Sequence, residues 1–309
     1  MPRIASFSSQ NFTGIRGFLR IPDYPLSNTS TDPTNEIWRS SRAPFGYQFV
    51  PNVGIFVDSP ITNMIGMFQN NSTAFASFND PDIATWDVST VTNMTFMFDN
   101  ANAFNQDLGS WDTSNVTSMF GMFRDAQNFN NGESSSINNW DTTNVTRMNS
   151  MFLNASAFNQ DIGLWDTSNV TRMDNMFDNA SSFDNGGSSS INNWNTTNVT
   201  KMDSMFEDAS VFNQDISNWN ISSVDEVNSM FRGASSFNQD ISQWDTSNVK
   251  GFDEAAGESG MTSMFRDATV FDQDLTGWNV QNIDSEPFGF ADNSALQQSN
   301  YPIWGTTGS

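Results

Sequence analysis

Tryptophan recurs along most of this chain at intervals that centre on 25 residues. The successive separations are 25, 29, 25, 29, 25, 25 and 34 residues, so two insertions of four residues and one of nine interrupt the base period. Such a period is typical of solenoid proteins, in which each unit is too small to enclose a core and stacks on its neighbours. The tryptophans that mark the units are Trp86, Trp111, Trp140, Trp165, Trp194, Trp219, Trp244 and Trp278.

Each unit reads, from its Trp, W-D-T-S-N-V-T-x-M-x-x-M-F-x-x-A-x-x-F-N-Q-D-I-x-x. The Val, Met, Met-Phe and Ala positions have helical spacing, and the D-T-S-N stretch before them offers helix-capping oxygens. The F-N-Q-D-I segment alternates apolar and polar residues, as a strand with one buried face does. We therefore predict an α/β fold: a solenoid with a parallel sheet on one side, short helices on the other, and atypical repeats that cap its ends.

Residues 1–52 do not fit the repeat and differ from it in charge. They carry five arginines against three acidic residues, whereas residues 53–309 carry 7 basic and 32 acidic residues. We predict an N-terminal arm or cap at 1–52, a solenoid of about eight units at 53–296 and a C-terminal cap or tail at 297–309. The arm either covers the first unit or docks the solenoid onto a larger assembly. The docking residues would then be Arg3, Arg16, Arg20, Arg39 and Arg42.

The composition limits the chemistry and the partners open to the chain. Its formal net charge is -23, and it contains neither cysteine nor histidine. The negative charge disfavours nucleic acid and anionic membranes. The missing residue types exclude disulfides, thiolate or imidazole metal ligands and Ser-His or Cys-His catalytic pairs. No apolar stretch is long enough to span a membrane, and the first residues do not resemble a secretion signal. We expect no nucleic-acid partner, no membrane insertion and no cofactor other than the calcium considered next.

Two sets of acidic residues recur at fixed positions of the unit. Stacked carboxylates can bind Ca²⁺ through oxygen ligands, and cations would reduce the self-repulsion of the chain. In the set that follows the Trp, asparagine replaces aspartate at 195, 220 and 279, which favours a turn-forming hydrogen bond over a metal site. That set comprises Asp87, Asp112, Asp141, Asp166 and Asp245. The candidate Ca²⁺ ligands are those of the Q-D-I element: Asp107, Asp161, Asp215, Asp240 and Asp274.

The two four-residue insertions lie at the same phase of alternate units. They are expected to project from one edge, where solenoids commonly carry recognition loops, unless they are neutral variation in flexible segments. The insertion at 251–259 enters at another phase. The predicted recognition loops consist of Asn131, Gly132, Glu133 and Ser134, and of Asn185, Gly186, Gly187 and Ser188.

Arg147, Arg172 and Lys201 occupy one position in three consecutive units. They either pair with nearby acids such as Asp174 and Asp203 or form a cationic stripe that receives an anionic glycan or partner. The tryptophans also allow two interpretations, a platform for sugars or a buried ladder. Their shared phase with Ile and Phe favours the structural core.

The string Trp-Asp-Thr-Ser-Asn-Val-Thr-x-Met-x-x-Met-Phe resembles the repeat of BspA-type leucine-rich-repeat proteins, which occur on bacterial surfaces. The resemblance covers about residues 53 to 296 and implies a leucine-rich-repeat-like solenoid with a role in adhesion or surface display. The first residues, from Pro2 to Ile15, resemble the start of structural proteins from marine tailed phages, which implies a place in a virion.

These observations favour a non-enzymatic structural and recognition protein. We expect it on a virion surface, as a phage decoration or fibre and host-attachment protein, oligomeric within its assembly. Other virion or surface-assembly proteins would bind residues 1–52, and a host surface glycan or protein could bind the exposed face. One alternative is a bacterial cell-surface adhesin, extracellular or on the cell surface. The other is a polysaccharide depolymerase that uses an Asp/Glu pair as acid and base.

Overall fold

The computed structural model describes residues 62–69, 78–251 and 259–308, together with three short strands nearer the N-terminus. These strands, β1 (Ile4–Ala5), β2 (Phe18–Arg20) and β3 (Gln48–Ile55), form an antiparallel sheet in the order β1-β3-β2. Ile4 pairs with Ile55 and Arg20 with Gln48. Strand β3 therefore runs across residue 52, the predicted end of the N-terminal arm.

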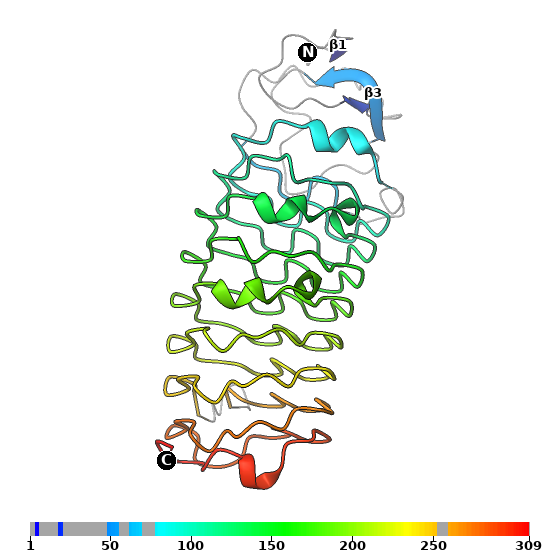
Figure 1. Ribbon diagram of the computed structural model, residues 1–309. Coiled ribbons are helices and arrows are strands. Elements are labelled where there is room, and N and C mark those ends of the chain that lie inside the picture. Colours follow the sequence, from blue (N-terminus) through cyan, green and yellow to red (C-terminus); the bar gives the residue numbers. More distant parts are fainter. Residues whose placement is uncertain are drawn as a thin grey trace, which may run out of the picture.

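Successive units form the rungs of an elongated stack (Figure 1). Isolated parallel bridges link each rung to the next, from Asn63 and Asn93 through to Lys201 and Glu226. Further backbone bonds accompany each bridge: the Met173 N–H donates to the Lys201 carbonyl at 3.1 Å. Each unit thus closes its interior against its two neighbours, as in other solenoids.

The segment predicted as a helix is a series of tight turns, so that prediction is wrong. Within one rung, the Met176 N–H donates to the Met173 carbonyl and the Ala180 N–H to the Phe177 carbonyl. Each of these turns contains an asparagine with a positive φ, which is 56° at Asn175 and 57° at Asn179. A left-handed residue every fourth position prevents a helix from continuing. The Phe177 N–H instead reaches the Met205 carbonyl of the next rung at 2.9 Å.

The predicted parallel sheet is also absent, because side chains take the backbone N–H groups of the F-N-Q-D-I segment. The Asn159 N–H donates to Oδ1 of Asn130 at 2.8 Å, and the Ile162 N–H donates to Oδ1 of Asn185 at 3.0 Å. Residues 62–69, 78–251 and 259–308 contain no strand, and their helices are 3₁₀ segments of at most five residues. The α/β leucine-rich-repeat-like architecture is therefore wrong, although the units do stack.

An asparagine ladder replaces the sheet on this side of the stack. Each member accepts a backbone N–H from its counterpart one rung further on, as Asn130 does from Asn159 and Asn213 from Asn238. Aspartate takes the same role twice. The ladder comprises Asn79, Asn105, Asn130, Asn159, Asp184, Asn213, Asn238 and Asp272.

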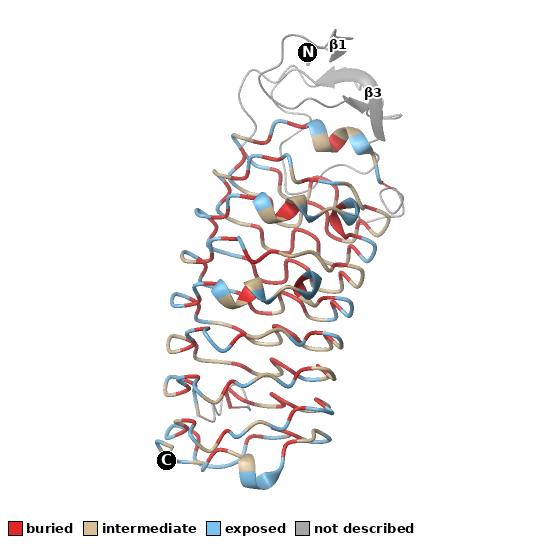
Figure 2. Ribbon diagram, in the orientation of Figure 1, coloured by how far each residue is buried: buried red, intermediate tan, exposed pale blue. Residues whose placement is uncertain are grey.

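Two columns of stacked phenylalanines fill the interior, which appears as buried segments along the whole stack in Figure 2. In the first column, Phe152, Phe177 and Phe206 lie face to face with centroids 5.6 Å apart. The second column runs beside it, with Phe183 3.8 Å from Phe177. These rings are fully buried, and burial of such apolar area provides most of the stabilisation.

Short 3₁₀ helices occur where a rung departs from the common unit. Helix η1 (Pro81–Thr85) precedes Trp86. Helix η2 (Asn131–Glu133) lies in one insertion and η3 (Ser135–Asn139) follows it, and η4 (Asn185–Gly187) lies in the other and η5 (Ser189–Asn193) follows it. In the part of the chain that the structure describes, no helix is both long and apolar enough to cross a membrane.

At the C-terminal end, η6 (Gln298–Asn300) is followed by two aromatic residues that cover the last rung. Tyr301 and Trp304 pack against Phe290, with centroid distances of 5.6 and 5.0 Å. The Phe290 ring stands at 88° to Phe265, whereas phenylalanines of successive earlier rungs are stacked. The predicted C-terminal cap begins at residue 297, so these contacts extend from it into the last repeat.

Candidate functional site

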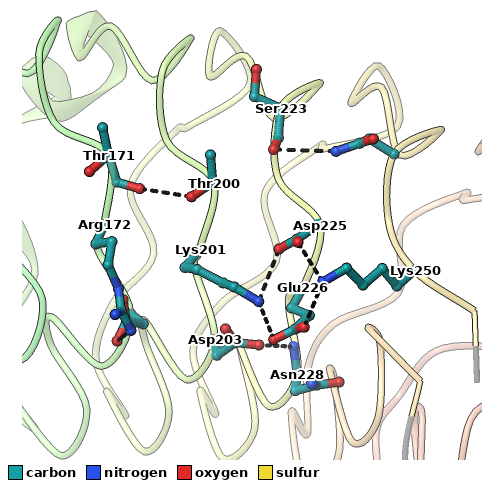
Figure 3. A network of polar contacts seen from close by, with 12 residues as sticks. Thr171, Arg172, Thr200, Lys201, Asp203, Ser223, Asp225, Glu226, Asn228 and Lys250 are labelled. Carbon is teal, nitrogen blue, oxygen red and sulfur yellow. Dashed lines mark hydrogen bonds and ion pairs between the residues drawn. The ribbon is translucent and has the colours of Figure 1, made fainter. Parts of the chain in front are cut away.

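A column of threonines from successive rungs runs along an exposed edge of the stack. From Thr92 onward, each threonine donates both its N–H and its hydroxyl to the threonine carbonyl of the preceding rung. For Thr200 and Thr171 these bonds measure 2.9 and 3.2 Å, and the hydroxyl bond is drawn in Figure 3. The column is therefore exposed yet held rigidly. Its members are Thr62, Thr92, Thr117, Thr146, Thr171 and Thr200.

The next residue of each rung forms the parallel bridge to its neighbours, and this set is called the bridge column. The type of residue at this position changes along the stack from neutral to cationic and then to acidic, while the parallel bridge is kept. The bridge column consists of Asn63, Asn93, Ser118, Arg147, Arg172, Lys201 and Glu226.

Two lysines and two acids form an ion-pair network at the far end of the bridge column (Figure 3). Lys201 Nζ lies 3.1 Å from Asp225 and 2.5 Å from Glu226, while Lys250 Nζ lies 2.6 and 3.2 Å from the same acids. The hydrogen bond from Lys201 is the main reason that the pKa of Glu226 is below its usual value. For Asp225, burial acts to raise the pKa, but both lysines outweigh it and the pKa is lowered.

Most other cations on the described surface are paired in the same way. Arg172 holds Asp174 through two hydrogen bonds of 2.8 Å, which confirms the predicted pairing with that residue. Lys201 pairs with Asp225 and Glu226, whereas pairing with Asp203 was the expectation. Such exposed pairs each stabilise the fold by only about 0–1 kcal/mol.

Two half-buried carboxyl groups lie near these networks. Burial raises the pKa of Asp203 to about 6; the charge of Glu226 adds to the shift and Lys201 opposes it. Burial raises the pKa of Asp178 to about 7; Glu207 and Asp208 add to that shift and Arg232 opposes it. Strongly perturbed carboxyl groups are candidates for proton transfer, although networks that only stabilise a fold also produce them.

The acidic residue that follows each Trp forms the expected turn. Oδ1 of Asp166 accepts the N–H of Ser168 at 2.9 Å, and Oδ1 of Asn220 does the same for Ser222. Asparagine can replace aspartate there because the bond needs an acceptor and no charge. All positions of this set behave alike.

The candidate Ca²⁺ ligands also cap turns. Oδ1 of Asp240 accepts the Ser242 N–H, and Oδ1 of Asp161 accepts both the Gly163 N–H and the Ser190 hydroxyl. Asp107, Asp215 and Asp274 accept equivalent bonds. Among the described residues, no three or more acidic side chains gather where they could hold a metal ion.

The predicted recognition loops are partly built into the stack. Asn131 and Asn185 are fully buried, and each accepts a backbone N–H from the preceding rung, from Leu108 and Ile162 respectively. The loop residues Gly132, Glu133, Gly186 and Gly187 are exposed, and Ser134 and Ser188 are half-buried. Only the tips therefore remain open to a partner.

The insertions also require a particular neighbour in the preceding rung. A Cβ added to Gly163 would lie 2.0 Å from Ser190 Oγ, and one added to Gly109 would lie 2.1 Å from Ser136 Oγ. The equivalent position of the other rungs carries a side chain, as Ala84, Asn138, Asn192, Ser217, Ser242 and Thr276. Among the described rungs, glycine occurs at this position only in the two that precede an insertion, which indicates that the insertion segments pack against them, a pattern that our sequence analysis missed.

The predicted core tryptophans lie in the interior and are at most 5% exposed. Trp140 and Trp165 stack at 6.0 Å, as Trp194 and Trp219 do at 5.8 Å. Each indole N–H from Trp111 onward donates to a carbonyl of an earlier rung. Of the predicted docking arginines, Arg20 lies in β2; Arg3, Arg16, Arg39 and Arg42 lie outside the described residues.

Sequence analysis also passed over two phenylalanines, Phe96 and Phe120, at half-buried outer positions of adjacent rungs. Arg124 lies over Phe96 and Arg147 over Phe120. Most equivalent positions of later rungs carry Asn, Asp, Ser or Thr. The sequence signal for this cluster was therefore the presence of phenylalanine where the repeat otherwise has a polar residue.

Stacked rungs joined by side-chain ladders define the class of this molecule: a solenoid of tandem 25-residue repeats. The chain belongs to the family described as "Mycoplasma protein of unknown function, DUF285", whose model matches residues 42–136, 133–189 and 186–304. The resemblance to a repeat family is thereby confirmed. No curated protein and no solved structure shows a significant match to the chain.

Proposed function

We propose that this protein is a non-enzymatic structural and recognition protein displayed on the surface of a particle or cell. The observation that carries the proposal is the rigid, exposed edge. Threonine side chains join the rungs from Thr62 to Thr200, and the Asn169 amide donates in the same way to the Thr143 carbonyl, so this edge has a fixed position over these rungs. A surface that pays little entropy on binding suits recognition of an extended partner.

The place of display follows from the two sequence resemblances. A relation of these repeats to BspA-type surface repeats favours an exposed location, and the N-terminal residues favour a phage virion. We infer a virion decoration or host-attachment role, with residues 1–52 as the docking part. The bacterial cell-surface adhesin is the alternative within the same class.

Fractionation of the native source distinguishes these locations. The chain should sediment with virions, and a variant that lacks residues 1–55, and with them the whole of strands β1, β2 and β3, should fold but remain unbound. Virions that incorporate the shortened chain normally would contradict docking through this segment. Recovery of the full chain in the cell envelope, away from virions, would favour the adhesin.

One observation favours an enzyme as a second candidate. Burial, with the charges of Glu207 and Asp208, raises the pKa of Asp178 to about 7, which is what a general acid requires near neutral pH. If the chain is a polysaccharide depolymerase, incubation with host capsular glycan should release new reducing ends, and Asp178→Asn should abolish the release. Asp203→Asn is the matched control for a perturbed carboxyl elsewhere on the stack.

A further inference from the structure

A cluster of aromatic and cationic side chains on the outer edge departs from the repeat. Phe96 and Phe120 belong to adjacent rungs, and their ring centroids lie 4.4 Å apart at an angle of 54°. The guanidinium of Arg124 lies 4.5 Å from the centre of Phe96, and that of Arg147 lies 4.8 Å from the centre of Phe120. We call these four residues the Arg147 cluster.

The two arginines of the cluster differ in their charge partners. Arg124 is held by Asp99 through bonds of 2.8 and 2.7 Å, which leave it neutralised. Arg147 is exposed and has no acidic group within 4 Å among the described residues. All other cations of residues 62–69, 78–251 and 259–308 have such a partner, namely Arg124, Arg172, Lys201, Arg232, Lys250 and Arg266. In a chain of net charge -23, an uncompensated arginine is the exception.

The backbone of the next rung is adapted to this cluster. Gly121 has φ of +58°, and a Cβ there would lie 2.4 Å from the Phe96 ring. The same position in later rungs carries Ser150, Ser204 and Ser229 at similar φ, so the conformation alone does not demand glycine. Glycine is needed at 121 because the Phe96 ring occupies the space.

The geometry points to a binding site for a single carboxylate carried on a sugar ring. A guanidinium that lies over a ring keeps its N–H edge free, and that edge matches the two oxygens of a carboxylate. Phe96 and Phe120 offer apolar surface to the C–H groups of a pyranose. Arg124 is paired with Asp99 and Asp125, so Arg147 is the one cation of the cluster that a ligand carboxylate can neutralise, whereas the chain as a whole repels polyanions. We therefore propose that the Arg147 cluster binds a uronic acid residue of a glycan that carries sparse charge.

This proposal rests on the recognition function proposed above and names its ligand class. Hyaluronan tetrasaccharide, in which glucuronate alternates with a neutral sugar, is the probe. Titration calorimetry on the full chain should detect binding. Arg147→Gln should weaken it by at least about tenfold, because a charge-assisted bidentate contact is lost. Gly121→Ser, which displaces Phe96, should also weaken it. Arg232→Gln, which removes a paired arginine in another column, should leave it unchanged.

Absence of binding at hyaluronan tetrasaccharide concentrations up to about 10 mM, a limit that corresponds to a negligible affinity, would overturn the proposal. Equal binding of neutral chitotetraose or of a glutamate hexapeptide would also overturn it. So would an equal loss of affinity in the Arg232→Gln control. Thermal melting of each variant shows whether it is folded. Failure here leaves surface display intact, since fractionation with virions tests that function separately.

Discussion

Replacement of Asn159 by alanine tests whether side-chain ladders hold the rungs together. Oδ1 of Asn159 accepts the N–H of Asp184 at 2.8 Å and that of Gly186 at 2.9 Å. Alanine leaves both donors without this acceptor. A partly buried donor without a partner costs about 1–3 kcal/mol, whereas water can replace the bond at an exposed one. Since the Asp184 bond is partly buried and the Gly186 bond exposed, we expect a total loss of about 1–3 kcal/mol.

Asn159→Asp is the matched control, because aspartate keeps the accepting oxygen. Asp184 already fills this position in the next rung, where its Oδ1 accepts the Asn213 N–H at 2.9 Å. Urea unfolding of the full chain, followed by tryptophan fluorescence, measures both variants. A loss below about 0.5 kcal/mol in the alanine variant, or equal losses in both, would refute the ladder as a stabilising element.

Three further predictions follow from other contacts. Burial is the main reason that the pKa of Asp178 is raised from 3.8 to about 7. The contribution of this group to the free energy of unfolding should therefore be highest below pH 3.8 and should fall as the pH rises from 3.8 to about 7, where this carboxyl group ionises in the folded chain. Asp178→Asn should therefore gain stability relative to the native chain between pH 5 and pH 8 in parallel urea titrations; an unchanged difference would contradict the shift. Gly163→Ala should cost about 1–3 kcal/mol because its Cβ would overlap Ser190, while Gly277→Ala, with no atom within 4 Å, should be neutral in the same assay. Melting with and without a chelator tests the Ca²⁺ prediction: a bound ion stabilises the folded state, and an equal melting temperature would argue against one.

The period, the stacking of the units and the burial of the tryptophans follow from the sequence, because only a shared interior can enclose so many apolar residues in such short units. The secondary structure of each unit could not be derived correctly from the same pattern. Val170, Met173 and Phe177 have helical spacing, but a chain of four-residue turns places apolar side chains at the same intervals. The asparagines at 175 and 179, which favour left-handed backbone, were the signal against a helix.

The candidate site was predictable only in part. The pairing of Arg172 with Asp174 and the turn role of the Asp column could be derived from residue types and their replacement by asparagine. The Arg147 cluster could not, because it depends on which neighbours lie beside each other across rungs. The buried Asn131 was likewise hidden, since a polar residue in a glycine-rich insertion is typical of a surface loop.

The last phenylalanine has a consequence for how copies of this chain meet. Inside the molecule every unit offers a flat ring to the unit that follows, and such a surface would accept a second molecule equally well. Phe290 is turned on its edge and is enclosed by Tyr301 and Trp304. At this end of the stack, a second copy would therefore find no flat ring on which to stack, and the covered Phe290 disfavours end-to-end association through this face.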